Sequence, residues 1–78
     1  MSPKFPAVAS DDIVAVLKRK DFKFKRQSGS SHAIYYRESD GRRTVVPIHT
    51  GKIVRRKTFK SILVDAGLTR EEFIELKG

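Results

Sequence analysis

A chain of 78 residues with 38% hydrophobic side chains is long enough for one small domain and too short for a second. It contains no cysteine, which excludes disulfides, thiol nucleophiles and cysteine-type zinc sites, and its longest apolar run, Ile13 to Leu17, is far too short to cross a membrane. It carries 17 Lys and Arg against 9 Asp and Glu, a net charge of +8, so a polyanionic partner is the first hypothesis.

Further absences narrow the class of protein. The two histidines and nine acidic residues follow no metal-ligand spacing, and the N-terminus has no signal-peptide apolar region. We therefore expect a cytoplasmic protein that binds no metal and no other cofactor and has no membrane partner.

The N-terminal part is predicted to be an extended lead-in over residues 1–9, followed by a single domain over residues 10–78. Prolines at positions 3 and 6 oppose an early helix, because proline lacks a backbone donor and restricts the residue before it. Ser10 is the predicted N-cap of a helix over about 11–20, with acidic residues in its first turn and cations in its last. Three apolar side chains share one face of this helix: Ile13, Val16 and Leu17.

The hydrophobic period then changes from 3.6 residues to 2, which indicates strands. Phe22 and Phe24 alternate with lysines and predict a first strand of about six residues with both rings in the core. A second strand is predicted over 32–37, after a turn that contains Gly29.

A third strand is predicted over 42–48, joined to the second by a hairpin turn at Asp40-Gly41, where the glycine accepts a positive φ. Pro47 has no N–H for a strand ladder, so we expect it at a strand end or a sheet edge. Neither hairpin leaves length for a crossover. The strands should therefore form an antiparallel three-stranded sheet with the helices on one face.

A second helix is predicted after the strands, with Thr58 as a possible cap and Gly67 as its stop. Its apolar face consists of Phe59, Ile62, Leu63 and Ala66. Thr69 and Glu72 match a capping box and predict a short third helix over about 70–76. The expected fold class is α+β, α-β-β-β-α with a short C-terminal helix, an order that resembles the double-stranded-RNA-binding domain without defining a function.

The positive charge is concentrated in the middle of the chain. Residues 18–60 contain 14 Lys and Arg and three acidic residues, a net charge of +11, whereas both flanking segments are slightly acidic. Solubility alone does not require this asymmetry, so a nucleic acid is favoured over a merely solvated surface.

Four motifs occur in order along the chain, at 29–35 (GSSHAIY), 40–42 (DGR), 45–49 (VVPIH) and 57–69 (KTFKSILVDAGLT). In this order and at this spacing they closely resemble the HicA toxins of bacterial and archaeal toxin–antitoxin operons, from about Ile13 to Leu76. The resemblance implies a small mRNA interferase with a double-stranded-RNA-binding-like fold. It also implies a HicB-type antitoxin as partner, with the toxin monomeric when free and hetero-oligomeric with its antitoxin.

The resemblance also implies that His32 is the catalytic residue, since a histidine after a Gly-Ser pair holds this role in the family. The family's Gly-Ser-His appears here as Gly29-Ser30-Ser31-His32. RNA supplies its own nucleophile, the 2′-hydroxyl, so an endoribonuclease needs only a group that accepts or donates a proton near neutral pH and cations for the phosphate. Ser31 and His49 are candidate auxiliary groups, and for His49 a structural hydrogen bond to the following loop is favoured over proton donation.

Nine cations are candidate RNA contacts: Lys23, Lys25, Arg26, Arg42, Arg43, Lys52, Arg55, Arg56 and Lys57. Tyr35 and Tyr36 could stack on unpaired bases, but at least one of them must face the helices. The side of the sheet that carries His32 stays ambiguous, because His32 shares strand parity with Ile34, which could belong to the core.

Two alternative functions remain open: a non-catalytic RNA-binding module, and a protein whose basic face binds an acidic protein partner.

Overall fold

The computed structural model describes residues 8–29, 31–48 and 53–77, and its element order confirms the predicted fold class. The elements are α1 Ser10–Arg19, β1 Lys23–Ser28, β2 His32–Arg37, β3 Arg42–Pro47, α2 Arg56–Ala66 and α3 Arg70–Lys77. The three strands form one antiparallel sheet in the order β1-β2-β3, with β2 in the centre. No helix among these elements is long and apolar enough to cross a membrane.

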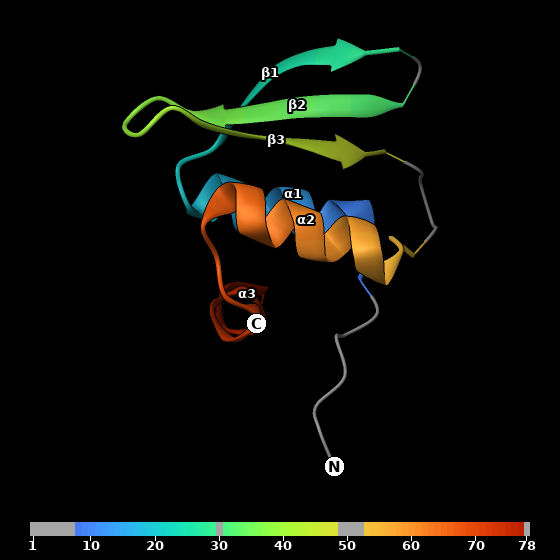
Figure 1. The fold of residues 1–78 in the computed structure, drawn as a ribbon, viewed down its shortest axis with the longest axis vertical. Helices are drawn as coiled ribbons and strands as arrows, with labels where there is room; N and C mark the ends of the chain where they lie inside the picture. The colour runs from blue at the N-terminus through green and yellow to red at the C-terminus, as the bar shows by residue number, and fades with distance from the viewer. Residues whose placement is uncertain (1–7, 30, 49–52, 78) are drawn as a thin grey trace.

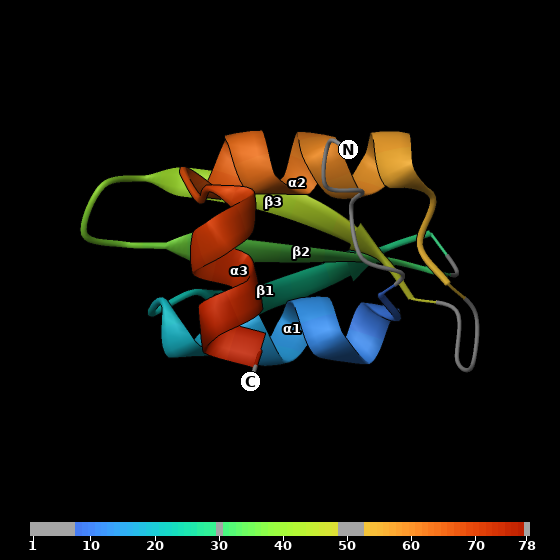
Figure 2. The ribbon, with the colours of Figure 1, turned by 90° about the horizontal axis from the view of Figure 1, so that it is seen from below.

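The molecule has three layers. Helices α1 and α2 lie side by side beneath the sheet (Figure 1), and α3 runs across them on their far side (Figure 2). The opposite face of the sheet carries none of the three helices described. We call the helix-covered side of the sheet its inner face and the other side its outer face.

The core lies between the inner face and the helices. Phe22, Ile13 and Leu17 come from α1 and the segment after it, and each is at most 2% exposed. Phe59 of α2 and Phe73 of α3 meet edge to face, with ring centroids 4.7 Å apart, and both are almost fully buried. This aromatic pair attaches α3 to the two-helix layer.

The cross-strand register determines which strand residues reach this core. Ala33 pairs with Val46 and Tyr35 with Thr44, and all four side chains are buried. Burial also raises the pKa of the Tyr35 phenol. These residues define the inner face.

The prediction that Phe24 belongs to the core is wrong. Phe24 pairs with Tyr35, and the two rings meet edge to face with their centroids 5.8 Å apart. The side chain of Phe24 is nevertheless 53% exposed. β1 is an edge strand, so no further strand covers it, and a register shift between Phe24 and Arg26 breaks the simple alternation. Phe22 is buried as predicted, but it lies before the strand rather than in it.

The N-caps of α1 and α2 also differ from prediction. Ser10 is the buried first residue of α1, and Ala9 is the N-cap, whose N–H donates to Asp12 Oδ2 at 3.0 Å. α2 begins at Arg56 instead of near Thr58, because the Phe59 N–H already closes a turn on the Arg55 carbonyl at 2.9 Å. The capping box of α3 is confirmed: Thr69 N–H donates to Glu72 Oε1, and Glu72 N–H donates to Thr69 Oγ1, both at 3.0 Å.

The end of the predicted lead-in takes part in the fold. The Val54 N–H donates to the Val8 carbonyl at 2.8 Å, and Ala9 forms an antiparallel bridge with Ile53. Val8 is fully buried. The segment before α1 is thus paired with the segment before α2.

Arginine side chains bind the C-terminal carbonyl groups of all three helices. Arg19 donates to the Leu76 carbonyl of α3, and Arg37 donates to the Lys20 carbonyl after α1 at 3.0 Å. Arg42 donates to the Asp65 carbonyl of α2 at 3.2 Å. Cations are favourable there because the helix dipole leaves partial negative charge on these carbonyls.

Asp40, in the turn between β2 and β3, connects two of these arginines. Its carboxylate lies 2.8 Å from Arg37 Nη2 and 3.3 Å from Arg42 Nε. The hydrogen bond from Arg37, then the Arg42 N–H and the two positive charges, lower the pKa of Asp40 to about 2. The hairpin is therefore tied to the C-terminal ends of both α1 and α2 through one carboxylate.

Replacing Phe73 by Ala should destabilise the protein by about 3 kcal/mol or more, because it removes a buried ring and the edge-to-face contact with Phe59. Ile74→Ala is the matched control, since Ile74 is the next residue of α3 and is 50% exposed. It should change the free energy of unfolding by no more than about 0.5 kcal/mol. Urea unfolding followed by circular dichroism measures both. Similar losses for the two variants would contradict the placement of α3.

Acid should weaken the fold as Asp40 becomes protonated. A folded-state pKa of about 2, below the ordinary value of 3.8, means that ionised Asp40 stabilises the fold above pH ~4 and that this stability is lost as the pH falls toward 2. Asp40→Asn should therefore flatten the dependence of the urea midpoint on pH in this window, whereas Glu38→Gln in the same turn should keep it. Parallel curves for Asp40→Asn and the native protein would rule out this coupling.

Candidate functional site

His32 lies on the outer face of the sheet. It is the first residue of β2, its side chain is exposed, and its cross-strand partners are Ser28 and Pro47. The ambiguity over its side is resolved by Ile34, which is only 7% exposed but does not belong to the core cluster that contains Ala33 and Tyr35. Because Ala33 and Tyr35 face the helices, strand alternation places Ile34 and His32 together on the outer face.

The turn before His32 is held in place from both sides. Gly29 adopts the left-handed conformation with φ +66°, which suits a residue without a Cβ. The Ser31 carbonyl accepts the Ile48 N–H at 2.6 Å, which links the start of β2 to the end of β3. Ser31 is half-buried and directly precedes His32. His49 lies outside the described residues, as does Ser30.

The register arranges the outer face in three rows across the sheet. Ser28, His32 and Pro47 form the first row, and Arg26, Ile34 and Val45 form the second. Lys23, Tyr36 and Arg43 form the third. Pro47 ends β3 in an edge strand, as predicted.

Arg26 is the candidate cation that the register places nearest to His32. It pairs with Ile34, two residues along β2 from His32, so it is a diagonal neighbour at about 7–8 Å between backbones, within reach of a long side chain. Arg26 is exposed. A guanidinium here can hold a phosphate bidentately beside the imidazole.

Three more candidates lie at the far end of the same face. Lys23 and Arg43 flank Tyr36 in the third row, and Lys25 sits at the register shift of β1 with its Nζ 5.5 Å from the centre of the Tyr36 ring. Tyr36 is half-buried, whereas Tyr35 faces the helices. Of the two tyrosines considered for stacking, only Tyr36 is on the face of His32.

The structure does not place the other candidate cations on the outer face. Arg42 is held by Asp40 and by the end of α2. Arg55, Arg56 and Lys57 are exposed at the start of α2. This end of α2 belongs to the helix layer and lies at the same end of the molecule as the start of β2 (Figure 1). Lys52 lies outside the described residues.

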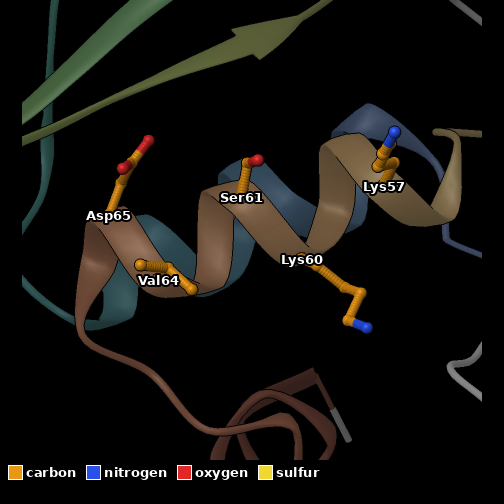
Figure 3. A pocket seen from close by; sticks show the side chains of 5 residues that line it. All are labelled: Lys57, Lys60, Ser61, Val64 and Asp65. Carbon is orange, nitrogen blue, oxygen red and sulfur yellow. The ribbon is translucent and has the colours of Figure 1, made fainter.

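A surface pocket runs along α2, well away from the outer face. Lys57, Lys60, Ser61, Val64 and Asp65 line it, and Figure 3 shows Ser61 and Asp65 on the side of the helix toward the sheet. Thr44 Oγ1 donates to Asp65 Oδ2 at 3.3 Å. Lys60 was not among the predicted cations, although its position three residues after Lys57 was the available signal.

The apolar part of the outer face was not predicted either. Ile34 is buried there, and Val45 is 42% exposed beside it. The signal was the Val45-Val46 pair, because adjacent strand residues must point to opposite faces and only one of them could enter the core. Across residues 8–29, 31–48 and 53–77, no group of three or more His, Asp or Glu side chains is placed to hold a metal ion.

The fold and the site define a class of protein: a small α+β domain with the α-β-β-β-α order of elements and a C-terminal helix, and with a histidine on the exposed, cationic face of its sheet. Comparison with known families then gives the relationship. The model of the HicA toxin family, toxins of bacterial toxin–antitoxin systems, matches residues 10–68, which is 59 of the 78 residues. The chain belongs to this family and is a toxin of a toxin–antitoxin system. No curated protein matches the chain.

Two neighbouring arginines of β3 should respond differently to removal of their charge. Arg43→Gln should weaken the binding of single-stranded RNA and reduce the slope of log affinity against log salt by about 0.7, the loss of one phosphate contact. Arg42→Gln should leave that slope unchanged and lower the melting temperature, because Arg42 binds Asp40 and the end of α2. Fluorescence anisotropy at several salt concentrations and thermal unfolding measure the two effects. A reduced slope for Arg42→Gln but not for Arg43→Gln would mean that RNA uses another surface.

Proposed function

We propose that the toxin is a metal-independent endoribonuclease that cleaves mRNA, with His32 as its general acid/base. The observation that carries this proposal is the position of His32: exposed, on a sheet face free of the described helices, and diagonal to Arg26 of β1, with further cations of both edge strands at the other end of the same face. Membership of the HicA toxin family supports the same activity.

The reaction needs little from the protein. The 2′-hydroxyl attacks the adjacent phosphorus and loses its proton, the bond from phosphorus to the 5′-oxygen breaks, and that oxygen gains a proton. The products are a 2′,3′-cyclic phosphate and a 5′-hydroxyl. His32 performs one of the two proton transfers, and because His32 is exposed to solvent, a water molecule accepts or donates the other proton.

Arg26 is proposed as the cation that stabilises the negative charge on the phosphorus in the transition state. Its diagonal position across β1 and β2 would place a guanidinium and the imidazole on the same phosphate. The remaining outer-face cations, Lys23, Lys25 and Arg43, extend this charge along the sheet and would bind neighbouring phosphates.

The antitoxin partner is proposed to be of the HicB type and to bind the toxin as a hetero-oligomer in the cytoplasm, the toxin being monomeric when free. The net charge of +8 favours an acidic partner surface, because opposite charges accelerate association. An antitoxin that covers the outer face would block His32 directly.

Replacing His32 by Ala should reduce cleavage of a single-stranded RNA by about 10²-fold or more, the usual contribution of a general acid/base. Val45→Thr is the matched control, since Val45 is exposed on the same face, and it should keep most of the activity. Cleavage is followed on denaturing gels with EDTA present throughout. Both variants should keep the native circular dichroism spectrum.

The substrate provides an independent test of the same mechanism. An oligonucleotide with a single deoxyribose at the scissile position lacks the nucleophile and should remain intact, while the matching all-ribose strand is cut. Cleavage of the deoxyribose strand, or full activity of His32→Ala, would reject the mechanism. Tight RNA binding without any cleavage by the native protein would favour the non-catalytic RNA-binding module instead.

A further inference from the structure

The third row of the outer face has the composition of a nucleotide-binding subsite. Tyr36 lies at its centre, and its cross-strand partners on the two sides are the exposed cations Lys23 and Arg43. An aromatic ring between two cations matches the two parts of an unpaired nucleotide, a flat base and a charged phosphate. The proposed reaction at His32 assigns no proton transfer to either cation.

Tyr36 is half-buried, and one face of its ring is covered by the side chain of the exposed Lys25. Lys25 Nζ lies 5.5 Å from the ring centre, so a solvated cation already occupies the position above the ring. Lysine side chains are flexible, so an incoming base can displace Lys25, whose ammonium then remains close to the backbone phosphates. The ring itself is held by β2, the central strand of the sheet.

The position of this row relative to His32 is set by one strand. Tyr36 is four residues after His32 in β2, about 13 Å along the strand at 3.3 Å per residue, and both side chains point to the outer face. Ile34 and Val45 lie between them and give an apolar surface without competing acidic groups. A single strand of RNA can therefore follow β2 from one row to the other.

We infer that Tyr36, flanked by Lys23 and Arg43, stacks an unpaired base of single-stranded RNA at a subsite about 13 Å from the phosphate bound at His32. This inference rests on the proposed function for its ligand, RNA, but not on cleavage. It makes single-stranded RNA the substrate class, since bases paired in a duplex do not present a free face to the ring.

The test compares two uncleavable probes of equal length and charge, a mixed-sequence 2′-O-methyl oligoribonucleotide and the corresponding oligomer in which every base is absent. The native protein should bind the base-carrying probe about 5- to 150-fold more tightly, the ordinary range for stacking one base. Tyr36→Val, which keeps a strand-forming residue, should bring this ratio close to one, and Tyr36→Phe should restore it. Fluorescence anisotropy measures all six affinities, two probes for each of the three proteins.

Phe24→Val is the matched control, because Phe24 is also an exposed aromatic of the sheet but pairs with Tyr35 on the inner face. It should leave the ratio at the native value. A native ratio near one, or an unchanged ratio in Tyr36→Val, would overturn the inference, since the face would then be only a charged surface, equally suited to an acidic protein. Because the probes cannot be cleaved, this outcome is independent of whether the native protein cuts RNA.

Discussion

The arrangement of the molecule depends on one ionic cluster at the β2–β3 turn. Asp40 holds Arg37 and Arg42, and these two side chains reach the terminal carbonyls of α1 and α2 respectively. Both helices lie on the face of the sheet toward which these arginines point, so the cluster holds the hairpin to the two helix ends that pack there. The Arg37 guanidinium also covers the ring of Phe22 at 4.6 Å, which connects this cluster to the core. An isolated exposed ion pair contributes little, whereas here each charge also binds a helix end.

Covering one face leaves the other face open, and the charge distribution follows from this. The inner face takes the buried strand residues, and apart from Arg37 and Arg42, which bind the helix ends, the cations that the register places on a face of the sheet lie on the outer one: Lys23, Arg26 and Arg43. Close placement of like charges opposes folding in the absence of a counter-charge. An anionic ligand reduces the repulsion between these charges. The proposed RNA substrate and the antitoxin of this toxin family would both provide one.

Local sequence signals were sufficient wherever backbone chemistry decides the structure. The Thr69–Glu72 capping box, the left-handed Gly67 and the Asp40-Gly41 turn were predictable because each depends on residues within four positions. Apart from the N-caps of α1 and α2, the errors concern features that depend on distant neighbours. Phe24 follows the alternating pattern of a buried residue, but an edge strand and a register shift leave it exposed. Arg42 is a residue type that often binds phosphate, but its guanidinium donates to a carbonyl at the end of α2. The two segments are so close that a Cβ at Gly67 would lie 2.9 Å from Arg42 Cζ.

The sequence by itself determined the order of the elements, the concentration of positive charge between residues 18 and 60, and the identity of His32 as the candidate catalyst through its resemblance to a toxin family. The tertiary structure alone decided on which face of the sheet His32 lies, which of Tyr35 and Tyr36 is available to a ligand, and which cations share that face. The physical reason is that strand parity divides side chains into two sets without saying which set is buried. That choice is made by the packing of two helices, which come from opposite ends of the chain.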